Sequence, residues 1–587
     1  MIERGKSPPA LPDPVFGAPE NGGTAGTGAA SAAGARAAAA GPAESDAGAA
    51  AAADASRGRA ALVAAGILLS RVAGFARDRA LAVYFGTGLH ADVFSAGLRM
   101  PNVLQNLLGE GTLSASFIPV YSELLEQGRL KEAGRVAGAA FALLLVVAAA
   151  VSLVGITLAP WIVTMFAPGF EGERRELTIA ITRILFPMTG VLVLSAWALG
   201  VLNSHRKFFV PYFAPVLWNA AIVAALIAFA GRLDLDGLLL AAAWGALVGG
   251  GLQLAVQLPW VVRLDREIRL GAGRAEPAFR EAVRNALPAI AGRGVVQLGT
   301  YGDLILASLL AVGALTRLRY AQTLYILPIS LFGMSVAAAA LPELARERAS
   351  AVNALRARTA GAARRVAFYV VPSFVAFALL GDVLVAGLYQ AGRFGSADVT
   401  IVWLTLAAYG LGLPASATTR VYQSAFFALR DTTTPARVAG IRIAAAAAAG
   451  AVLMTQFEPV TIGPITIPAG IFGGATAGGL PLGPVGLALG SAVGAWIEWR
   501  LLATRLERRI GPVAAGAGAL ARMLVAALAA AAAAHAVRLA LGGLHPLPAA
   551  AIVATVFGAV YLGAASALGL DEARALAEGI RRRLSRG

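Results

Sequence analysis

The 587-residue chain has no cysteine, only three lysines and only four histidines. The lack of cysteine excludes disulfides and thiolate metal sites. The histidines, His90, His205, His535 and His545, show none of the spacings of a zinc enzyme, so we expect no catalytic zinc site. Charged residues make up only 14% of the chain, against about 25% in soluble domains. The net charge of +16 comes almost entirely from arginines between apolar segments, which argues against nucleic-acid binding.

Long apolar runs replace the missing charge, since 58% of the residues are hydrophobic. Runs of about 20 residues, enough to cross a bilayer as helices, recur along the chain. We predict an all-α polytopic membrane protein with about fourteen spans. Arginine-rich loops alternate with arginine-poor ones, which predicts that both termini are cytoplasmic.

An internal repeat organises these spans. Similar motifs begin near Pro119 and Pro342, near Phe166 and Tyr389, and near Pro211 and Pro435, which are 223 or 224 residues apart. This offset covers six spans, an even number, so the repeats are parallel, as in alternating-access transporters. The expected parts are a disordered cytoplasmic tail (1–60), an N-lobe (61–262), a C-lobe (281–503), two further spans (518–569) and a basic cytoplasmic tail (570–587).

Ionisable residues inside the first two expected spans indicate a functional site, because a charge in hydrocarbon needs a partner or a water-filled cavity. The span at 61–86 contains Arg71, Arg77 and Asp78, with Arg71 and Asp78 on one face. The span at 90–118 has polar residues at spacings of three and four, which place them on one helix face. We call this set the stripe: Asp92, Ser95, Arg99, Asn102, Asn106 and Glu110.

Two interpretations of these residues stay open. They line a central cationic cavity between the two lobes for an anionic substrate, since arginine binds phosphate oxygens bidentately. Alternatively they form internal ion pairs, such as Arg71–Asp78 or Arg99–Asp92, that only hold helices together. The span at 281–312 adds Asp303 and Arg293, which is the repeat counterpart of Arg71 within one residue.

Several motifs resemble the MurJ/MviN lipid II flippases of the multidrug/oligosaccharidyl-lipid/polysaccharide exporter superfamily. The resemblance covers about residues 60–570. Its motifs are Ser70–Asp78, Tyr84–Gly86, Ala91–Asp92, Arg99–Asn102, Gly109–Gly111, Phe117–Pro119, Phe213–Pro215, Gln257–Pro259 and Ala428–Pro435.

This resemblance implies a transporter of the bacterial inner membrane, not an enzyme. It would move undecaprenyl-pyrophosphate-linked disaccharide-pentapeptide from the cytoplasmic to the periplasmic leaflet. It implies a lipid-tail groove at the spans in 518–569. It also implies functional roles for Arg71, Arg77, Asp78, Asp92, Asn102 and Glu110. No cofactor is expected, and membrane potential or a monovalent cation would drive transport. Expected partners are lipid II, membrane lipids and cell-wall synthesis enzymes.

The chain departs from the family pattern at three places. Gln105 or Asn106, and Thr323, stand where family arginines are expected, and Arg293 is a candidate replacement. Asp303 matches one ligand of a family sodium site, but the facing segment Ala444–Ala449 offers no side-chain oxygen. These departures keep two alternatives open: an exporter of another polyprenyl-linked glycan, and a membrane scaffold that does not transport.

Overall fold

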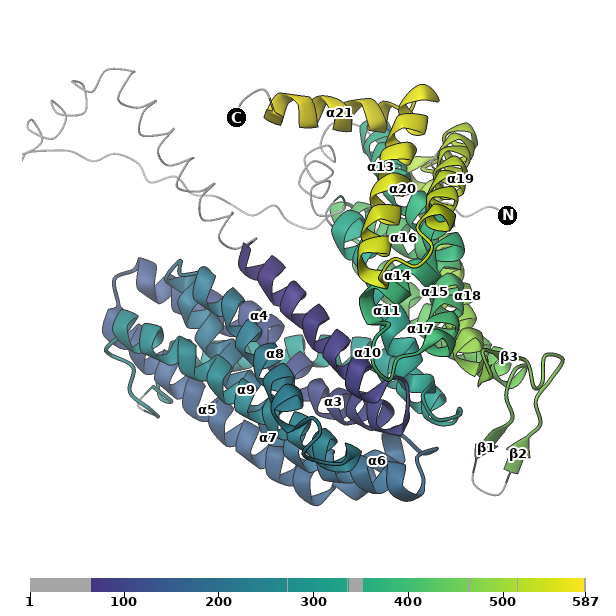
Figure 1. The fold of residues 1–587 in the computed structure, drawn as a ribbon. Helices are drawn as coiled ribbons and strands as arrows, with labels where there is room; N and C mark the ends of the chain where they lie inside the picture. Colours follow the sequence, from purple (N-terminus) through teal and green to yellow (C-terminus); the bar gives the residue numbers. More distant parts are fainter. Residues whose placement is uncertain are drawn as a thin grey trace, which may run out of the picture. The chain divides into compact units, whose positions relative to one another are not determined.

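We describe the protein from a computed structural model (Figure 1). The structure describes residues 65–271, 273–334, 336, 352–462, 465–514 and 516–584. Within these ranges it describes all side chains except those at 110, 289, 291–300, 577 and 579–584. The expected tail 1–60, the side chains of Glu110 and Arg293, and most side chains of the basic tail therefore lie outside the described residues.

Helices form nearly all regular structure in the described ranges, as the long apolar runs predict (Figure 1). The first helix covers 65–85. The others are α3 (Leu89–Leu108), α4 (Glu110–Glu126), α5 (Leu130–Thr157), α6 (Ala159–Phe166), α7 (Gly172–Ser204), α8 (Phe209–Phe229), α9 (Leu235–Leu264), α10 (Pro277–Ser308), α11 (Ala314–Pro328), the π-helix η1 (Ile329–Met334), α13 (Val352–Leu379), α14 (Gly381–Tyr389), α15 (Ser396–Leu411), α16 (Leu413–Ala428), α17 (Thr433–Thr455), α18 (Gly483–Ile510), α19 (Ala517–Ala540), α20 (Pro546–Ala567) and α21 (Asp571–Leu584).

Two short antiparallel hairpins lie in the loop between α17 and α18. They are β1 (Val460–Ile462) with β2 (Ile465–Ile467), and β3 (Thr476–Ala477) with β4 (Leu480–Pro481).

Nine described helices are long and apolar enough to cross a membrane, or ten if the bent pair α15–α16 is one span. The chain is therefore a multi-pass membrane protein, while the count of fourteen spans stays a prediction. The expected spans at 61–86, 90–118, 281–312 and 316–341 are not among the nine. α3 and α4 divide residues 90–118 at Gly109, and α11 has 15 residues. The helix over 65–85 and α10 contain ionisable residues.

The backbone of the two repeats matches at the predicted offset. In the described residues only Arg206 and Arg430 combine a side chain with positive φ, 59° and 58°, and they are 224 residues apart. A left-handed residue other than glycine is uncommon. Its recurrence at the same place, in the turn after the fourth expected helix of each repeat, indicates that the two copies share one local fold.

Contacts between α3 and α11 indicate where the two-fold axis that relates the two repeats lies. Thr316 donates a hydrogen bond to Asp92, its counterpart 224 residues earlier, and Arg99 donates one to Gln322, 223 residues later. A residue that contacts its own counterpart lies on the axis relating the copies. The two pairs are seven residues apart on α3 and six on α11, about 9 to 10 Å along the helices. The axis therefore runs along the helices, as parallel repeats require.

Two hydrophobic clusters lie within the first repeat, and a third, built mainly on the second repeat, also includes Ala82, Ala96 and Met100 of the first. In the first repeat, α3, α7, α8 and α9 share one cluster, and α4, α5 and α7 share another. The second repeat is built around a cluster that includes α11 and α13 to α18. The last helices, α19 and α20, pack against each other and against α13 and α14.

Close contacts between the repeats follow the same symmetry. Gly169 donates a hydrogen bond to the Ser308 hydroxyl, and a Cβ on Gly169 would lie 2.2 Å from the Ser308 carbonyl oxygen. Gly392, 223 residues later, has φ +55°, and a Cβ there would lie 2.4 Å from the Val83 carbonyl oxygen. Only glycine allows the loop backbone to approach the end of the facing helix this closely.

Candidate functional site

The stripe runs along α3, and its burial changes from one end to the other. Asp92 and Ser95 are buried, Arg99 and Asn102 are half-buried, and Asn106 is exposed. α3 then ends at Gly109, where a Cβ would lie 2.2 Å from the Gln105 carbonyl oxygen. Glu110 therefore begins α4 rather than continuing the helix. The stripe is enclosed at its Asp92 end and increasingly accessible toward Asn106.

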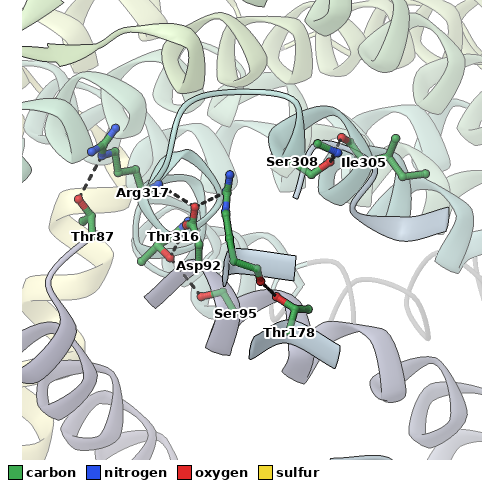
Figure 2. Close-up of polar contacts among 11 residues, drawn as sticks. Thr87, Asp92, Ser95, Thr178, Ile305, Ser308, Thr316 and Arg317 are labelled. Carbon is green, nitrogen blue, oxygen red and sulfur yellow. Dashed lines mark hydrogen bonds and ion pairs between the residues drawn. The ribbon is translucent and has the colours of Figure 1, made fainter. Parts of the chain in front are cut away.

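At the enclosed end, the Asp92 carboxylate accepts hydrogen bonds from two other helices and their flanking backbone (Figure 2). The Gly313 and Thr316 amides donate to it at 2.7 and 2.8 Å, and the Thr316 hydroxyl donates at 2.7 Å. Arg174 of α7 forms an ion pair with the same carboxylate. The carboxylate thus caps the start of α11, where backbone amides and the helix dipole favour an anion.

Neighbouring contacts extend this arrangement to α15. The Arg317 Nε donates to the Thr87 hydroxyl at 3.1 Å (Figure 2). That hydroxyl donates to Asp398. We call Thr87, Asp92, Arg174, Thr316, Arg317 and Asp398 the polar cluster. It joins the two repeats, so at Asp92 the geometry supports a helix-joining role. The expected pair Arg99–Asp92 is wrong, because Arg174 is the partner of Asp92.

Further along, two arginines from different repeats share the carboxylate of Asp78. Arg77 donates to Asp78 Oδ1 at 2.9 Å, and Arg319 of α11 donates to the same atom at 3.0 Å. Asp78 is buried, while 15% and 20% of the two arginine side chains are exposed. The Arg77 guanidinium also lies 5.0 Å from the centre of the Trp218 ring. Two positive charges against one negative charge leave the group cationic.

Arg71 lies apart from this group. It is exposed, and the expected pair Arg71–Asp78 is wrong because Arg77 and Arg319 are the partners of Asp78. Arg77 is next to Asp78 in the sequence, so helix geometry predicts that the two side chains point to different faces. Its long side chain nevertheless reaches the neighbouring carboxylate.

A second polar group surrounds Gln322. Its carbonyl oxygen accepts from Arg99 at 2.7 Å, and its amide donates to the Tyr409 hydroxyl at 2.8 Å and to Asp303 at 3.4 Å. Gln322 therefore links Arg99 of the stripe to Asp303. A monovalent-cation site at Asp303 stays a prediction.

The sequence analysis missed Arg174, Arg317, Arg319 and Gln322 as members of these groups. Arg317 and Arg319 lie in the expected span at 316–341. An ionisable residue inside a span indicates a functional site, as it does for Arg71 and Arg77. Arg174 lies in a loop by sequence, where an arginine is ordinary. Its role depends on a contact with a residue 82 positions away.

Comparisons with known proteins identify the family of the chain. The family model "Lipid II flippase MurJ" matches residues 81–553. The Lipid II flippase MurJ of Burkholderia cenocepacia is 32% identical over 459 residues, covering 77% of this chain and 84% of that protein. The chain belongs to the MurJ family. A probable lipid II flippase MurJ of Rhizobium tropici is 34% identical over 394 residues, covering 65% of this chain and 72% of the relative.

Solved structures confirm the all-α transporter fold. A MurJ lipid II flippase in an inward closed conformation aligns with a TM-score of 0.66 at 21% identity, covering 87% of this chain and 99% of that structure. An inward-facing multidrug resistance MATE transporter aligns with a TM-score of 0.58 at 17% identity, covering 74% and 94%. The MurJ family is a family of flippases, so the chain is a transporter relative rather than an enzyme.

The MurJ pattern has an arginine at the position of Thr323, and the structure shows another arginine of α11 near that position. Arg319 precedes Thr323 by one helical turn, and the Thr323 hydroxyl donates to the Arg319 carbonyl oxygen at 2.9 Å. α11 therefore still presents a guanidinium toward the helix over 65–85, one turn earlier. Arg293, the replacement suggested by the sequence, has a side chain outside the described residues.

Proposed function

We propose that this protein moves lipid II from the cytoplasmic to the periplasmic leaflet of a bacterial inner membrane by alternating access. Relatives at 32% and 34% identity are named as a lipid II flippase and a probable one. The observation that carries the proposal is the pair of guanidiniums, Arg77 and Arg319, that come from different repeats and meet at Asp78.

Chemistry supports a pyrophosphate at this pair. Arginine forms bidentate, charge-assisted hydrogen bonds to phosphate oxygens and stays charged at any working pH. Asp78 neutralises one of the two cations, and an incoming pyrophosphate would neutralise the other. Because the cations belong to different repeats, one anion between them would draw the repeats together.

The stripe extends the proposed site toward sugar and peptide. Arg99, Asn102 and Asn106 offer donors and acceptors that become more accessible along α3. We assign Glu110 to the same surface from its sequence position. Arg71 and Arg293 are assigned to attracting the acidic headgroup, Arg71 from its exposed position and Arg293 from the repeat.

Orientation follows from the charge of the loops. Arginine-rich loops are expected in the cytoplasm, which places both termini there and the polar cluster at the periplasmic end. The burial gradient of the stripe then favours a state that is closed toward the periplasm and accessible from the cytoplasm. Release into the periplasm requires the contacts of Asp92 with Gly313 and Thr316 to break, because these contacts join the two repeats.

We also propose that transport draws on membrane potential or on a monovalent cation near Asp303. Each elementary charge moved through 100 mV supplies about 2.3 kcal/mol. Cell-wall synthesis enzymes are the proposed protein partners, because they act on the delivered precursor.

Complementation tests the proposal in a strain depleted of its own lipid II flippase. The unchanged chain should restore growth, and Arg77→Ala and Arg319→Ala should each abolish rescue. Arg508→Ala is the matched control, because Arg508 is exposed near the end of α18, away from Asp78. Immunoblots of membranes establish equal amounts. Rescue by both site variants would remove the arginine pair from the mechanism, and failure of the unchanged chain to rescue would favour a scaffold.

A second candidate is export of another polyprenyl-linked glycan, favoured by Gln105 and Thr323 where the family has arginines. Binding of lipid II and of an unrelated polyprenyl-pyrophosphate sugar to the purified protein separates the two. Tighter binding of lipid II supports the proposal, and tighter binding of the other lipid overturns it.

A further inference from the structure

Three side chains with metal-binding atoms meet beside the polar cluster, from parts of the chain that are distant in sequence. They are His90 in the first turn of α3, Glu173 in the first turn of α7 and Asp236 in the first turn of α9. One ligand atom of each lies within 4.8 Å of the other two. The His90 Nε2 is 2.6 Å from Asp236 Oδ1, although the two residues are 146 positions apart.

From this arrangement we propose that His90, Glu173 and Asp236 bind one divalent transition-metal ion, zinc by preference. Zinc binds imidazole nitrogen and carboxylate oxygen at about 2.0–2.2 Å and completes an open three-residue site with water. Ligand atoms on such a shell are about 3.3 Å apart. Shifts of about 1 Å therefore convert the observed group into a coordination shell.

The side chains combine one fixed ligand with two adaptable ones. The His90 ring stacks on Phe85, with ring centres 6.0 Å apart, and only 16% of its side chain is exposed. Asp236 has 42% of its side chain exposed, and Glu173 is exposed. The carboxylates can thus close on an ion that the imidazole positions.

The composition of the group favours zinc over magnesium or calcium. Those ions prefer ligand sets of oxygen alone, whereas a mixed imidazole and carboxylate set suits zinc and its neighbours in the transition series. Helix N-termini attract carboxylates by themselves, which accounts for Glu173 and Asp236. It does not account for the imidazole nitrogen placed against a carboxylate.

The site adjoins the contact between α3 and α7. His90 precedes Asp92 by two residues, Glu173 immediately precedes Arg174, and Asp92 and Arg174 form the ion pair of the polar cluster. A metal held by His90 and Glu173 would tie the starts of α3 and α7 together beside that pair. Zinc should therefore stabilise the first repeat at the end where it contacts the second.

Zinc titration of the purified full chain, followed by isothermal titration calorimetry, tests the proposal. One zinc ion should bind per chain. His90→Gln and Asp236→Asn should each weaken binding by about tenfold or more, a loss that even outer-shell changes produce at metal sites. His535→Gln is the matched control, because His535 is an exposed histidine on α19 and should bind zinc like the unchanged chain.

Two further measurements separate ligand loss from misfolding. Melting temperatures in EDTA should be alike for all four proteins, and cobalt(II) should give the visible absorption of a low-coordinate site only where His90 is present. Unchanged zinc affinity in His90→Gln and Asp236→Asn would overturn the proposal, as would equal loss in His535→Gln. Since the readout is metal binding alone, it is independent of lipid transport.

Discussion

Replacing Asp92 by alanine should strongly destabilise the protein. The carboxylate is fully buried and accepts from four donors: Arg174 Nη2, the Gly313 amide, and the Thr316 amide and hydroxyl. Removing one partner of a buried ion pair costs about 3–5 kcal/mol, because the other charge is left uncompensated. Each backbone amide that loses its acceptor adds to this cost by about 1–3 kcal/mol. We therefore expect Asp92→Ala to lose at least about 3 kcal/mol.

A double-mutant cycle identifies the source of this loss. Arg174 has only 7% of its side chain exposed, so it is the charge that Asp92→Ala leaves unpaired. Arg174→Met fills a similar volume without charge. Adding it to Asp92→Ala should therefore restore at least about 1 kcal/mol, since residues in contact are energetically coupled. Melting temperatures of the purified proteins in one detergent measure both effects.

The same substitution should open the contact between α3 and α11. Because the chain has no native cysteine, a single Ser95→Cys reports access directly. Ser95 is 3% exposed and lies 3.4 Å from the Thr316 hydroxyl. A membrane-impermeant maleimide should label it slowly, and faster when Asp92 is alanine. Ser396→Cys, at an exposed position, is the labelling control. An Asp92→Ala protein with unchanged melting temperature and unchanged labelling would refute the reasoning.

Three further predictions concern the loops. Gly392→Ala should destabilise the protein by about 1 kcal/mol or more and lower its melting temperature, because Gly392 has positive φ and an added Cβ would contact the facing backbone. Gly395→Ala is the control, because an added Cβ there has no atom within 4 Å. Asp431 accepts hydrogen bonds from the Thr434 hydroxyl and amide, which hold its pKa below the usual range. Asp431→Ala should lower the stability by about 1 kcal/mol at neutral pH. This loss of stability should vanish as pH falls below the ordinary aspartate pKa and through the lowered one. Burial raises the pKa of Glu458, so its contribution to stability is full at low pH and is lost as pH rises through that raised pKa. Glu458→Gln should remove this loss of melting temperature at pH above the ordinary glutamate pKa, and a curve parallel to that of the unchanged chain would contradict this.

Periodicity and repetition in the sequence predicted the arrangement of the helices. The offset of 223 or 224 residues recurs in the matching φ angles of Arg206 and Arg430, and in the contact of Asp92 with Thr316. Spacings of three and four correctly placed Asp92, Ser95 and Arg99 on one face of α3. Both features can be predicted from a single sequence, because one depends on local spacing and the other on internal repetition.

Partners of the site residues were not predictable in the same way. Asp78 pairs with Arg319, 241 positions away, and Asp92 with Arg174, 82 positions away. Each pairing depends on which helices become neighbours, and periodicity carries no information about that. His90 illustrates the same limit, because it has no ligand spacing along the chain and gains its neighbours only when the first turns of three helices converge.

Lipid II translocation by the purified protein in proteoliposomes tests the central claim most directly. Fluorescent lipid II should reach the opposite leaflet with the unchanged chain and with Arg508→Ala, and translocation should fall to the protein-free rate with Arg77→Ala or Arg319→Ala. Translocation at the unchanged rate in both site variants would contradict the claim that guanidiniums from the two repeats together hold the headgroup.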